Sequence, residues 1–511
     1  HSREPFTKEE AKMKKLLSLL LALAVAFAIP AGPGLYVADA ATNGTAISTA
    51  DDLKAMEKNP SGSYYLANDI EVPANMMLFT NYNKPFTGTL DGNGHAIKGY
   101  TYTSSAEWTE QAALFGYTKN ATFKNLKMTN VNISLNQAGT VAPLVAATTG
   151  GTFSNISVSG KVTGKYMRIA AGIVAYSDKG GTFTNCKNSA DVTVTKADQG
   201  STIAGVASFL SSEASMKNCS NSGKISISGN IEGDSFIAAG VSSYVGKTTS
   251  CKNSGAITVS AIGNGTMNES SVAAGVAAEV DTAVSCSNTG KISMKATIEA
   301  VDPNRVGGVF GEVTKSASKC YNKGAVSYSG KSHRGVEAGG VSAFAKKVSQ
   351  SYNKGSVTVK MSSAKKAEDN KIGGVCGDTV DMRNCYNTGS VTVTGVAFVG
   401  GISGYAHPWG EKVVNNYNTG KVKASTKGAF KGQVIGGYEG AEMVQKRNIY
   451  DNYYTGSGKA YGWGFVTWHK WVAKASKVSS IKAASCPKLS SKYWTYSSKY
   501  GRMILKNNKE K

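Results

Sequence analysis

A five-residue turn sequence, Cys-Tyr-Asn-Lys-Gly at 320–324, recurs in near-copies along most of this chain. Alignment of the chain with itself gives one position equivalent to Cys320 in every 30 to 35 residues. These positions are Leu126, Ile156, Cys186, Cys219, Cys251, Cys286, Cys320, Ser351, Cys385 and Asn416. A chain of 511 residues is too long for one compact hydrophobic core, whereas stacked repeats extend without that limit because each repeat packs only against its neighbours. The sequence therefore predicts an array of at least ten stacked units.

Two residues after the Cys320 column, asparagine occupies every one of eight consecutive units. This asparagine column consists of Asn188, Asn221, Asn253, Asn288, Asn322, Asn353, Asn387 and Asn418. A side-chain amide at a turn bonds to the local backbone and to the asparagine of the next unit, so we expect the column to form a ladder. Two residues later stands glycine in seven of the units and Ala190 in the other. We expect these glycines to supply a positive φ at the turn.

Short strand-like segments flank each turn. Segments such as "KISI" at 224–227 and "SVTV" at 356–359 alternate apolar and polar residues, which indicates a strand with one buried face. Upstream of the turn, segments such as "AAGVAA" at 273–278 and "VGGVFG" at 306–311 indicate a second short strand of small residues. The 58 glycines and only 10 prolines also favour short strands and tight turns. We predict an all-β fold, a parallel β-solenoid of about ten or more coils.

Several of these phrases resemble a known family. The recurring "GGVFG" and "GGISG", the Cys-Tyr-Asn-x-Gly turn, the segment "PFTGTLDGNGHAIKGY" at 85–100 and the ending "YWTYSSKYGRMIL" at 493–505 are similar to the GLUG-repeat proteins of bacterial surfaces. The resemblance covers residues 45–505. It implies a right-handed parallel β-helix in a secreted or surface-exposed protein of adhesion-related function.

The first forty residues read as an export signal. Lys14 and Lys15 precede an apolar run at 16–29, and Ala38 and Ala40 form a small-residue cleavage pattern. We predict an extension of unclear origin at 1–12, a signal peptide at 13–40, an N-terminal cap at 41–110, β-helix repeats at 111–440 and a basic, aromatic C-terminal cap at 441–511. We therefore expect a secreted protein, with non-covalent association with the cell surface as an option.

Six of the eight cysteines occupy the repeat column, and they are Cys186, Cys219, Cys251, Cys286, Cys320 and Cys385. In-register neighbours are close enough for a disulfide, but their parallel Cβ vectors are a poor approach for one. Because Leu126, Ile156 and Ser351 fill the same column elsewhere, we expect a buried ladder of thiols. A disulfide between adjacent coils stays open as the alternative. Cysteine and histidine spacings do not match a zinc site, and we expect neither metal nor cofactor.

An enzyme is the main competing interpretation, because glycoside hydrolysis and lyase chemistry use positioned carboxylates and cations. The sequence offers carboxylates in several units but no evident column that they share. They include Asp191, Glu213, Asp234, Glu279, Asp281, Glu312 and Asp378. We therefore predict a non-catalytic protein, with a polysaccharide lyase or hydrolase as the alternative and a purely structural extracellular rod as a second alternative.

Residues 441–511 carry fourteen basic and three acidic side chains among many aromatic ones. Aromatic side chains beside lysine suit stacking on glycans and attraction of anionic polymers. The candidate binding residues are Trp463, Trp468, Lys470, Trp471 and Trp494. The alternative is a terminal cap that covers the last open coil. The net charge of +23 also favours an anionic partner. We predict an adhesion or binding scaffold for a cell-wall or host-matrix anionic polymer or glycan, with no specific nucleic-acid target.

Overall fold

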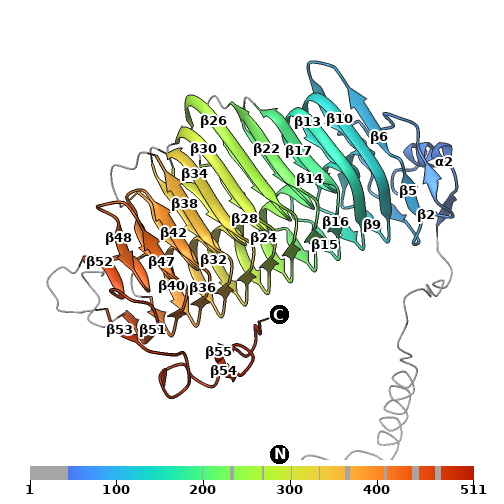
Figure 1. The fold of residues 1–511 in the computed structure, drawn as a ribbon. Helices are drawn as coiled ribbons and strands as arrows, with labels where there is room; N and C mark the ends of the chain where they lie inside the picture. Colours follow the sequence, from blue (N-terminus) through green and yellow to red (C-terminus); the bar gives the residue numbers. More distant parts are fainter. Residues whose placement is uncertain are drawn as a thin grey trace, which may run out of the picture. The chain divides into compact units, whose positions relative to one another are not determined.

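Nearly every strand of this protein pairs in parallel with the equivalent strand of the next coil, as Figure 1 shows for a computed structural model. The structure describes residues 44–510 apart from 198, 231–234, 268–269, 301, 333, 363–368, 408–410, 440–447 and 466–472. Within the described residues the fold is a parallel β-solenoid with one α-helix, so the predicted all-β solenoid is confirmed. The predicted signal peptide and extension lie outside the described residues.

Each coil has a long strand on one face of the solenoid. These strands are β10 (Lys127–Val141), β13 (Ser157–Ala171), β17 (Asp191–Ala197), β22 (Ile225–Asn230), β26 (Ile257–Met267), β30 (Ile292–Ala300), β34 (Val326–Ser332), β38 (Val357–Met361), β42 (Val391–Thr394) and β47 (Val422–Ala424). A short strand follows in most coils: β7 (Thr109–Ala112), β18 (Ser201–Ala204), β23 (Phe236–Ala239), β27 (Val272–Ala274), β31 (Asn304–Gly307), β35 (Val336–Gly339), β39 (Lys371–Gly373), β43 (Phe398–Gly400) and β48 (Phe430–Gly432).

The chain then bends and enters the strands of the other large sheet. These are β8 (Phe115–Lys119), β11 (Val145–Thr149), β14 (Val174–Ser177), β19 (Ala207–Leu210), β24 (Ser242–Thr249), β28 (Ala277–Val284), β32 (Phe310–Ser318), β36 (Ser342–Ser349), β40 (Cys376–Arg383), β44 (Ser403–Ala406), β49 (Ile435–Glu439) and β52 (Tyr461–Phe465). In some coils a separate strand continues this sheet: β9 (Thr122–Lys124), β12 (Thr152–Ser154), β15 (Thr182–Thr184), β20 (Ser215–Lys217), β45 (Val413–Val414) and β50 (Ile449–Tyr450).

A two-residue strand in most coils holds the asparagine column. These strands are β16 (Lys187–Asn188), β21 (Ser220–Asn221), β25 (Lys252–Asn253), β29 (Ser287–Asn288), β33 (Tyr321–Asn322), β37 (Tyr352–Asn353), β41 (Tyr386–Asn387) and β46 (Tyr417–Asn418), followed by β51 (Asn452–Tyr454). Outside the repeating coils lie β1 (Thr45–Ile47), α2 (Ala50–Ala55), η1 (Met56–Lys58), β2 (Ser63–Leu66), β3 (Ile70–Glu71), β4 (Thr89–Asp91), β5 (Ala96–Lys98), β6 (Thr101–Ser104), β53 (Ala475–Lys477), β54 (Trp494–Ser497) and β55 (Arg502–Leu505). No helix among the described residues has the length and apolar content to cross a membrane.

The asparagine column forms a continuous ladder through the interior. Each amide nitrogen donates to the amide oxygen of the next asparagine at 2.8–2.9 Å, from Asn188 to Asn418. Each also donates to the carbonyl oxygen two residues on, as Asn322 does to Gly324 at 2.7 Å. The ladder satisfies a row of buried amides, which would be costly without partners.

The turn glycines do not have the positive φ predicted for them. None of Gly223, Gly255 and the equivalent glycines lies in the left-handed region. Their lack of a side chain matters for another reason, since a Cβ on Gly324 would lie 1.9 Å from the Gly290 carbonyl oxygen. The left-handed residue is instead the one before each Cys320-column position. It is Asn125, Asn155, Asn185, Asn218, Ser250, Ser285, Lys319, Gln350, Asn384, Asn415 or Asp451, with φ between 48° and 59°.

The small-residue segment is not one strand, as predicted, but two strands joined by a sharp bend. In the coil that begins at β31, Val306 and Val309 point into the core while the glycines between them form the bend. A Cβ on Gly308 would lie 2.6 Å from the Asn322 side chain, so the asparagine ladder passes directly inside the bend. Only glycine fits between the ladder and the next coil at this position.

The cysteine column is buried, and all eight cysteines are free thiols in this structure. Several thiols donate to carbonyl oxygens, as Cys320 does to Ser318 at 3.2 Å. Burial raises the pKa of the Cys385 thiol to about 12. Farther toward the N-terminus the interior contains a stack of Phe123, Phe153 and Phe183, whose ring centroids are 5.4 and 4.8 Å apart.

The sequence predicts that the C-terminal residues cover the last coil as a cap. In the structure, residues 481–510 instead fold back along the side of the solenoid. Trp494 of β54 packs against Tyr386 and Tyr417, with centroids 6.0 and 5.4 Å away. Asn508 donates to the carbonyl oxygen of Cys320, three coils before Asn416, the last position of the repeat column. We call residues 481–510 the strap. It covers a column of stacked tyrosines, Tyr352, Tyr386, Tyr417 and Tyr453.

Candidate functional site

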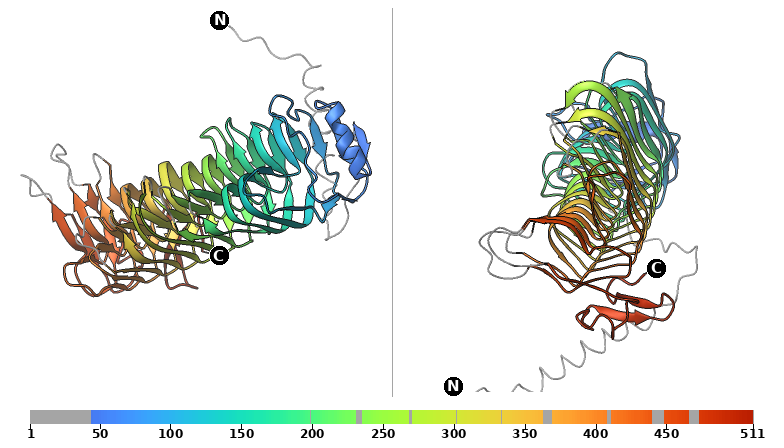
Figure 2. Two further views of the ribbon diagram at one scale, coloured as in Figure 1. Left: turned by 90° about the horizontal axis from the view of Figure 1, so that it is seen from above. Right: turned by 60° about the vertical axis from the view of Figure 1, so that its left-hand side comes forward.

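The bend in each coil creates a concave angle on the outer surface of the solenoid, which we call the corner. Outward-facing side chains of the strand before the bend meet those of the strand after it, and Ile237, Ala239, Val272, Ala278 and Tyr244 form one such cluster apart from the main core. Small residues line the base of the corner, because a Cβ on Gly377 would lie 2.7 Å from the Lys371 carbonyl oxygen. Two columns seven residues apart in sequence therefore face each other along the solenoid, and we call this the corner groove. The coils that carry these columns follow one another along the solenoid in both views of Figure 2.

One wall of the corner groove comes from the strands before the bend, and the other from the strands after it. The first wall contains Ile169, Thr202, Ile237, Val272, Arg305, Glu337, Lys371, Phe398 and Phe430 in register. The second contains Tyr117, Ala147, Tyr176, Phe209, Tyr244, Glu279, Glu312, Phe344, Asp378, Tyr405, Gly437 and Trp463.

The N-terminal section of the groove is aromatic and open. Tyr176, Phe209 and Tyr244 follow one another on successive coils, with ring centroids 5.8 and 4.8 Å apart. Phe209 and Tyr244 border a hollow of about 500 Å³. Trp108 also borders this hollow, and its ring centroid lies 6.2 Å from that of Tyr166. Trp108 is 47% exposed and Phe209 is 38% exposed, values that are unusual for large apolar side chains in a folded protein.

A second hollow of about 370 Å³ continues along the same wall. Tyr117 and Tyr176 border it together with Tyr82, whose ring meets that of Tyr117 edge to face at 5.4 Å. Tyr82 is 67% exposed. Four tyrosine and phenylalanine rings of the wall, from Tyr117 to Tyr244, are thus available along the N-terminal half of the groove.

The central section contains a row of charged side chains that bridge the two walls. Arg305 contacts Glu312 across the corner at 2.9 Å and its neighbour Glu337 at 3.0 Å. Lys371 contacts Asp378 across the corner at 2.6 Å and Glu337 at 3.7 Å. The row ends at His407, whose Nδ1 lies 3.1 Å from Asp378. We call these six residues the charged row.

The two innermost carboxylates of the charged row have opposite electrostatic environments. Burial raises the pKa of Glu337, and the repulsion from Asp378 adds to it against the attraction of Arg305. Burial also acts to raise the pKa of Asp378, but hydrogen bonding from His407 and the charge of Lys371 outweigh it and hold this pKa below its usual value. The Glu337 and Asp378 side chains are only 5% and 2% exposed, whereas those of Arg305, Glu312 and Lys371 are 21–25% exposed.

This arrangement corrects the expectation that the carboxylates share no column. Glu279, Glu312 and Asp378 lie on one wall of the groove in register, and Glu337 faces them from the other wall. The signal was present in the sequence as pairs seven residues apart across a Gly-Val bend, such as Arg305 with Glu312. Sequence reasoning does not pair these residues, because the Gly-Val segment between them has strand-like composition and predicts one strand without a bend.

The C-terminal section of the groove is aromatic again. The Phe398 ring lies 5.0 Å from Tyr405 and 5.6 Å from Trp463. The ammonium group of Lys371 stands 5.3 Å from the Tyr405 ring centroid. Trp463, one of the predicted binding residues, therefore belongs to the groove.

The other predicted binding residues are placed differently. Trp494 is 1% exposed and donates to the Asn384 side chain at 3.0 Å, so its indole has no open face in this structure. Trp468, Lys470 and Trp471 lie outside the described residues. Trp463 and Trp494 are on separate surfaces, one in the groove and the other in the strap.

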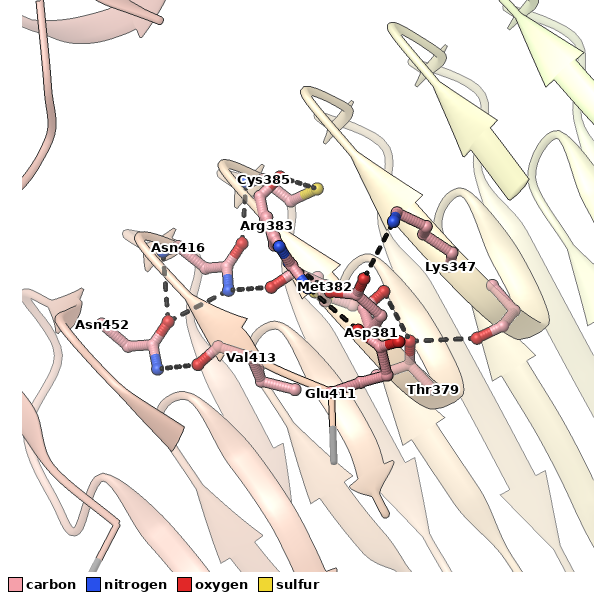
Figure 3. Close-up of polar contacts among 11 residues, drawn as sticks. Lys347, Thr379, Asp381, Met382, Arg383, Cys385, Glu411, Val413, Asn416 and Asn452 are labelled. Carbon is pink, nitrogen blue, oxygen red and sulfur yellow. Dashed lines mark hydrogen bonds and ion pairs between the residues drawn. The ribbon is translucent and has the colours of Figure 1, made fainter. Parts of the chain in front are cut away.

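A second polar cluster lies near the charged row on β40 (Figure 3). Asp381 is buried and contacts Arg383 at 2.7 Å and Lys347 at 3.3 Å, while Arg383 reaches Glu411 at 2.9 Å. Behind it, Asn416 takes the place of a ladder cysteine and accepts from the Cys385 backbone N–H at 2.8 Å. Two acidic and two basic side chains balance here, so we assign this cluster to the framework. Within the described part of the chain, no group of three or more potential ligands is placed to hold a metal ion.

Three comparisons relate the chain to known proteins. The family model described as the M26 IgA1-specific metallo-endopeptidase N-terminal region matches residues 35–160. Halomucin of Haloquadratum walsbyi (strain DSM 16790 / HBSQ001) is 29% identical over 135 residues, which are 23% of this chain and 1% of halomucin. The chain thus spans a very small part of that relative. A crystal structure of a proposed immunoglobulin A1 protease from Bacteroides ovatus aligns over 91% of this chain and 95% of its own, with 13% identity and a TM-score of 0.25.

Proposed function

We propose that this protein is an exported, non-catalytic scaffold that binds a glycan chain along the corner groove. The observation that carries this proposal is the row of Tyr176, Phe209 and Tyr244, which face the groove on successive coils. The faces of a pyranose ring are formed by C–H groups, so they stack on aromatic rings while the sugar hydroxyls stay hydrated. Successive coils are about 4.8 Å apart, close to the length of one sugar unit in an extended chain.

The comparisons support the extracellular part of this proposal. The matched family model describes the N-terminal region of a protease that acts on an immunoglobulin, and immunoglobulin A1 is found outside cells. The repeat phrases that resemble GLUG proteins agree with surface exposure. Because the match covers only residues 35–160, a role as the accessory region of a protease stays outside this proposal.

Binding of defined oligosaccharides tests the groove. We expect isothermal titration calorimetry to detect binding of cellohexaose or chitohexaose, whose β-1,4-linked rings present two apolar faces. Phe209→Ala should weaken that binding about fivefold or more, because a stacking ring contributes on the order of 1–3 kcal/mol in comparable recognition of flat ring systems. Tyr496→Ala is the matched control, since Tyr496 is 48% exposed but lies in the strap. Absence of binding, or equal weakening by both variants, would count against the groove.

A specific observation favours polysaccharide cleavage as a second candidate function. In the charged row, three carboxylates meet an arginine and a lysine in a groove, and the environments of Glu337 and Asp378 shift their pKa values in opposite directions. Such a pair suits general acid and base roles. Against it stands the burial of both carboxylates behind cations. Release of reducing ends from a polysaccharide would establish cleavage if Glu337→Gln abolished it. If no reducing ends are released from a panel of neutral and acidic polymers, binding is left as the function.

A further inference from the structure

The long strands β10 to β42, together with β6 before them, carry an unbroken column of hydroxyl side chains on their outer face. The column consists of Thr103, Ser134, Thr163, Thr193, Ser226, Thr258, Ser293, Ser327, Thr358 and Thr392, all paired in register. In Figure 1 these strands, from β10 to β42, follow one another along one side of the solenoid. Packing of the core requires only that these positions be polar, yet ten consecutive coils use serine or threonine.

Lysines flank this hydroxyl column on both sides. Seven exposed lysines stand two residues before or two residues after a position of the column. They are Lys161, Lys165, Lys224, Lys291, Lys295, Lys360 and Lys421. In the coil after Thr392, the column position itself is the exposed Lys423. The acidic residue in these positions is Asp191, which accepts from the Lys224 backbone N–H at 2.7 Å. We call this surface the hydroxyl–lysine face. It is strongly basic, and it lies on the outer side of β10 to β47.

We propose that the hydroxyl–lysine face binds an extended acidic polysaccharide that lies parallel to the solenoid axis. Each hydroxyl can accept from a sugar hydroxyl, and all except Ser327, whose Oγ donates to the Ile292 carbonyl oxygen at 3.3 Å, can also donate to a sugar hydroxyl or carboxylate. One hydroxyl lies about every 4.8 Å along the column. The flanking lysines attract the carboxylates of the polymer, and their flexible stems allow the charges to follow its spacing. Charge complementarity favours a uronic-acid polymer over a neutral one, and the regular hydroxyl spacing favours a sugar chain over an irregular polyanion.

The test compares two sets of lysine variants of the full chain with immobilised polygalacturonate. Lys224, Lys291, Lys295 and Lys360 are replaced together by glutamine in one variant. In the matched control, the exposed Lys54, Lys346, Lys477 and Lys506 are replaced, which removes the same charge outside the face. We expect the first variant to lose at least tenfold in affinity and the control to lose less than threefold, with binding of the unchanged protein weaker at higher salt.

Two further measurements separate this face from the groove and from adsorption by net charge. Thr258→Val with Thr358→Val removes two hydroxyls but no charge, and we expect several-fold weaker binding to polygalacturonate. The lysine variant should keep the binding of cellohexaose or chitohexaose, whereas Phe209→Ala should keep that of polygalacturonate. Equal losses in the two lysine sets, equal retention of single-stranded DNA and polygalacturonate, or no retention at low salt would overturn the proposal.

Discussion

At the scale of single residues, three repeated positions stabilise each coil, and each does so for a different physical reason. Asn353 takes part in four hydrogen bonds, two through its amide nitrogen and two through its oxygen. The bend position requires glycine because a Cβ there would collide with the asparagine ladder, as at Gly308 beside Asn322. Lys319 and Gln350, in contrast, hold left-handed backbone conformations that asparagine occupies in most coils.

Asn353→Ala should destabilise the solenoid strongly. The substitution removes one hydrogen-bond partner each from the Asn322 amide nitrogen, the Asn387 amide oxygen and the two backbone groups of Gly355 in a buried site, and such losses cost about 1–3 kcal/mol each. We expect the free energy of unfolding to fall by about 3 kcal/mol or more, measured by urea denaturation. Ser254→Ala, at an exposed turn position, serves as the control. A loss below about 1 kcal/mol would mean that the ladder is not essential.

Lys319→Asn should stabilise the protein. An L-residue in the left-handed region costs roughly 1–2 kcal/mol, and asparagine tolerates this region better than lysine. We expect a stability gain of about 0.5–1 kcal/mol, seen as a higher urea midpoint. Lys319→Ala removes the same charge, but alanine does not tolerate the left-handed region better than lysine, so this variant should not gain stability. If both variants were equally stable, charge would explain the effect.

At the scale of elements, the strap depends on a buried ionic contact. Glu510 accepts from Tyr386 at 2.8 Å and contacts Lys354 and Arg502 at 2.8 and 2.6 Å. Burial acts to raise the pKa of Glu510, but hydrogen bonds from Lys354 and Tyr386 and the charge of Arg502 hold it below its ordinary value. A carboxyl with a lowered pKa stabilises the folded state above its ordinary pKa, and this contribution is lost as the pH falls through the lowered value.

The strap should therefore loosen on acidification. We expect acrylamide quenching of Trp494, taken as the difference between the protein and its Trp494→Phe variant, to stay low near neutral pH and to rise as the pH falls below 4.5, the ordinary pKa of a glutamate. Glu510→Gln should remove most of that pH dependence, whereas Glu411→Gln, at an exposed ion pair, should leave it unchanged. A pH-independent signal in the unchanged protein would refute the role of Glu510.

At the scale of the whole molecule, the repeat columns predicted the parallel solenoid because in-register stacking is the way such units bury their apolar faces. The asparagine ladder followed from the same columns. The corner groove did not, because Gly-Val segments such as 307–309 have strand-like composition and their bend depends on contact with Asn322. The position of Trp494 was also unpredictable, since the strap crosses several coils and the sequence alone does not reveal which surface it covers.

The proposed glycan contact is the aromatic section of the corner groove. Hydroxyl-radical footprinting of the protein with and without saturating cellohexaose or chitohexaose tests it most directly. We expect slower oxidation of Trp108, Phe209 and Tyr244 in the presence of the bound oligosaccharide and no change at Tyr496, which is similarly exposed. Unchanged oxidation of the three groove aromatics, or equal protection of Tyr496, would contradict it.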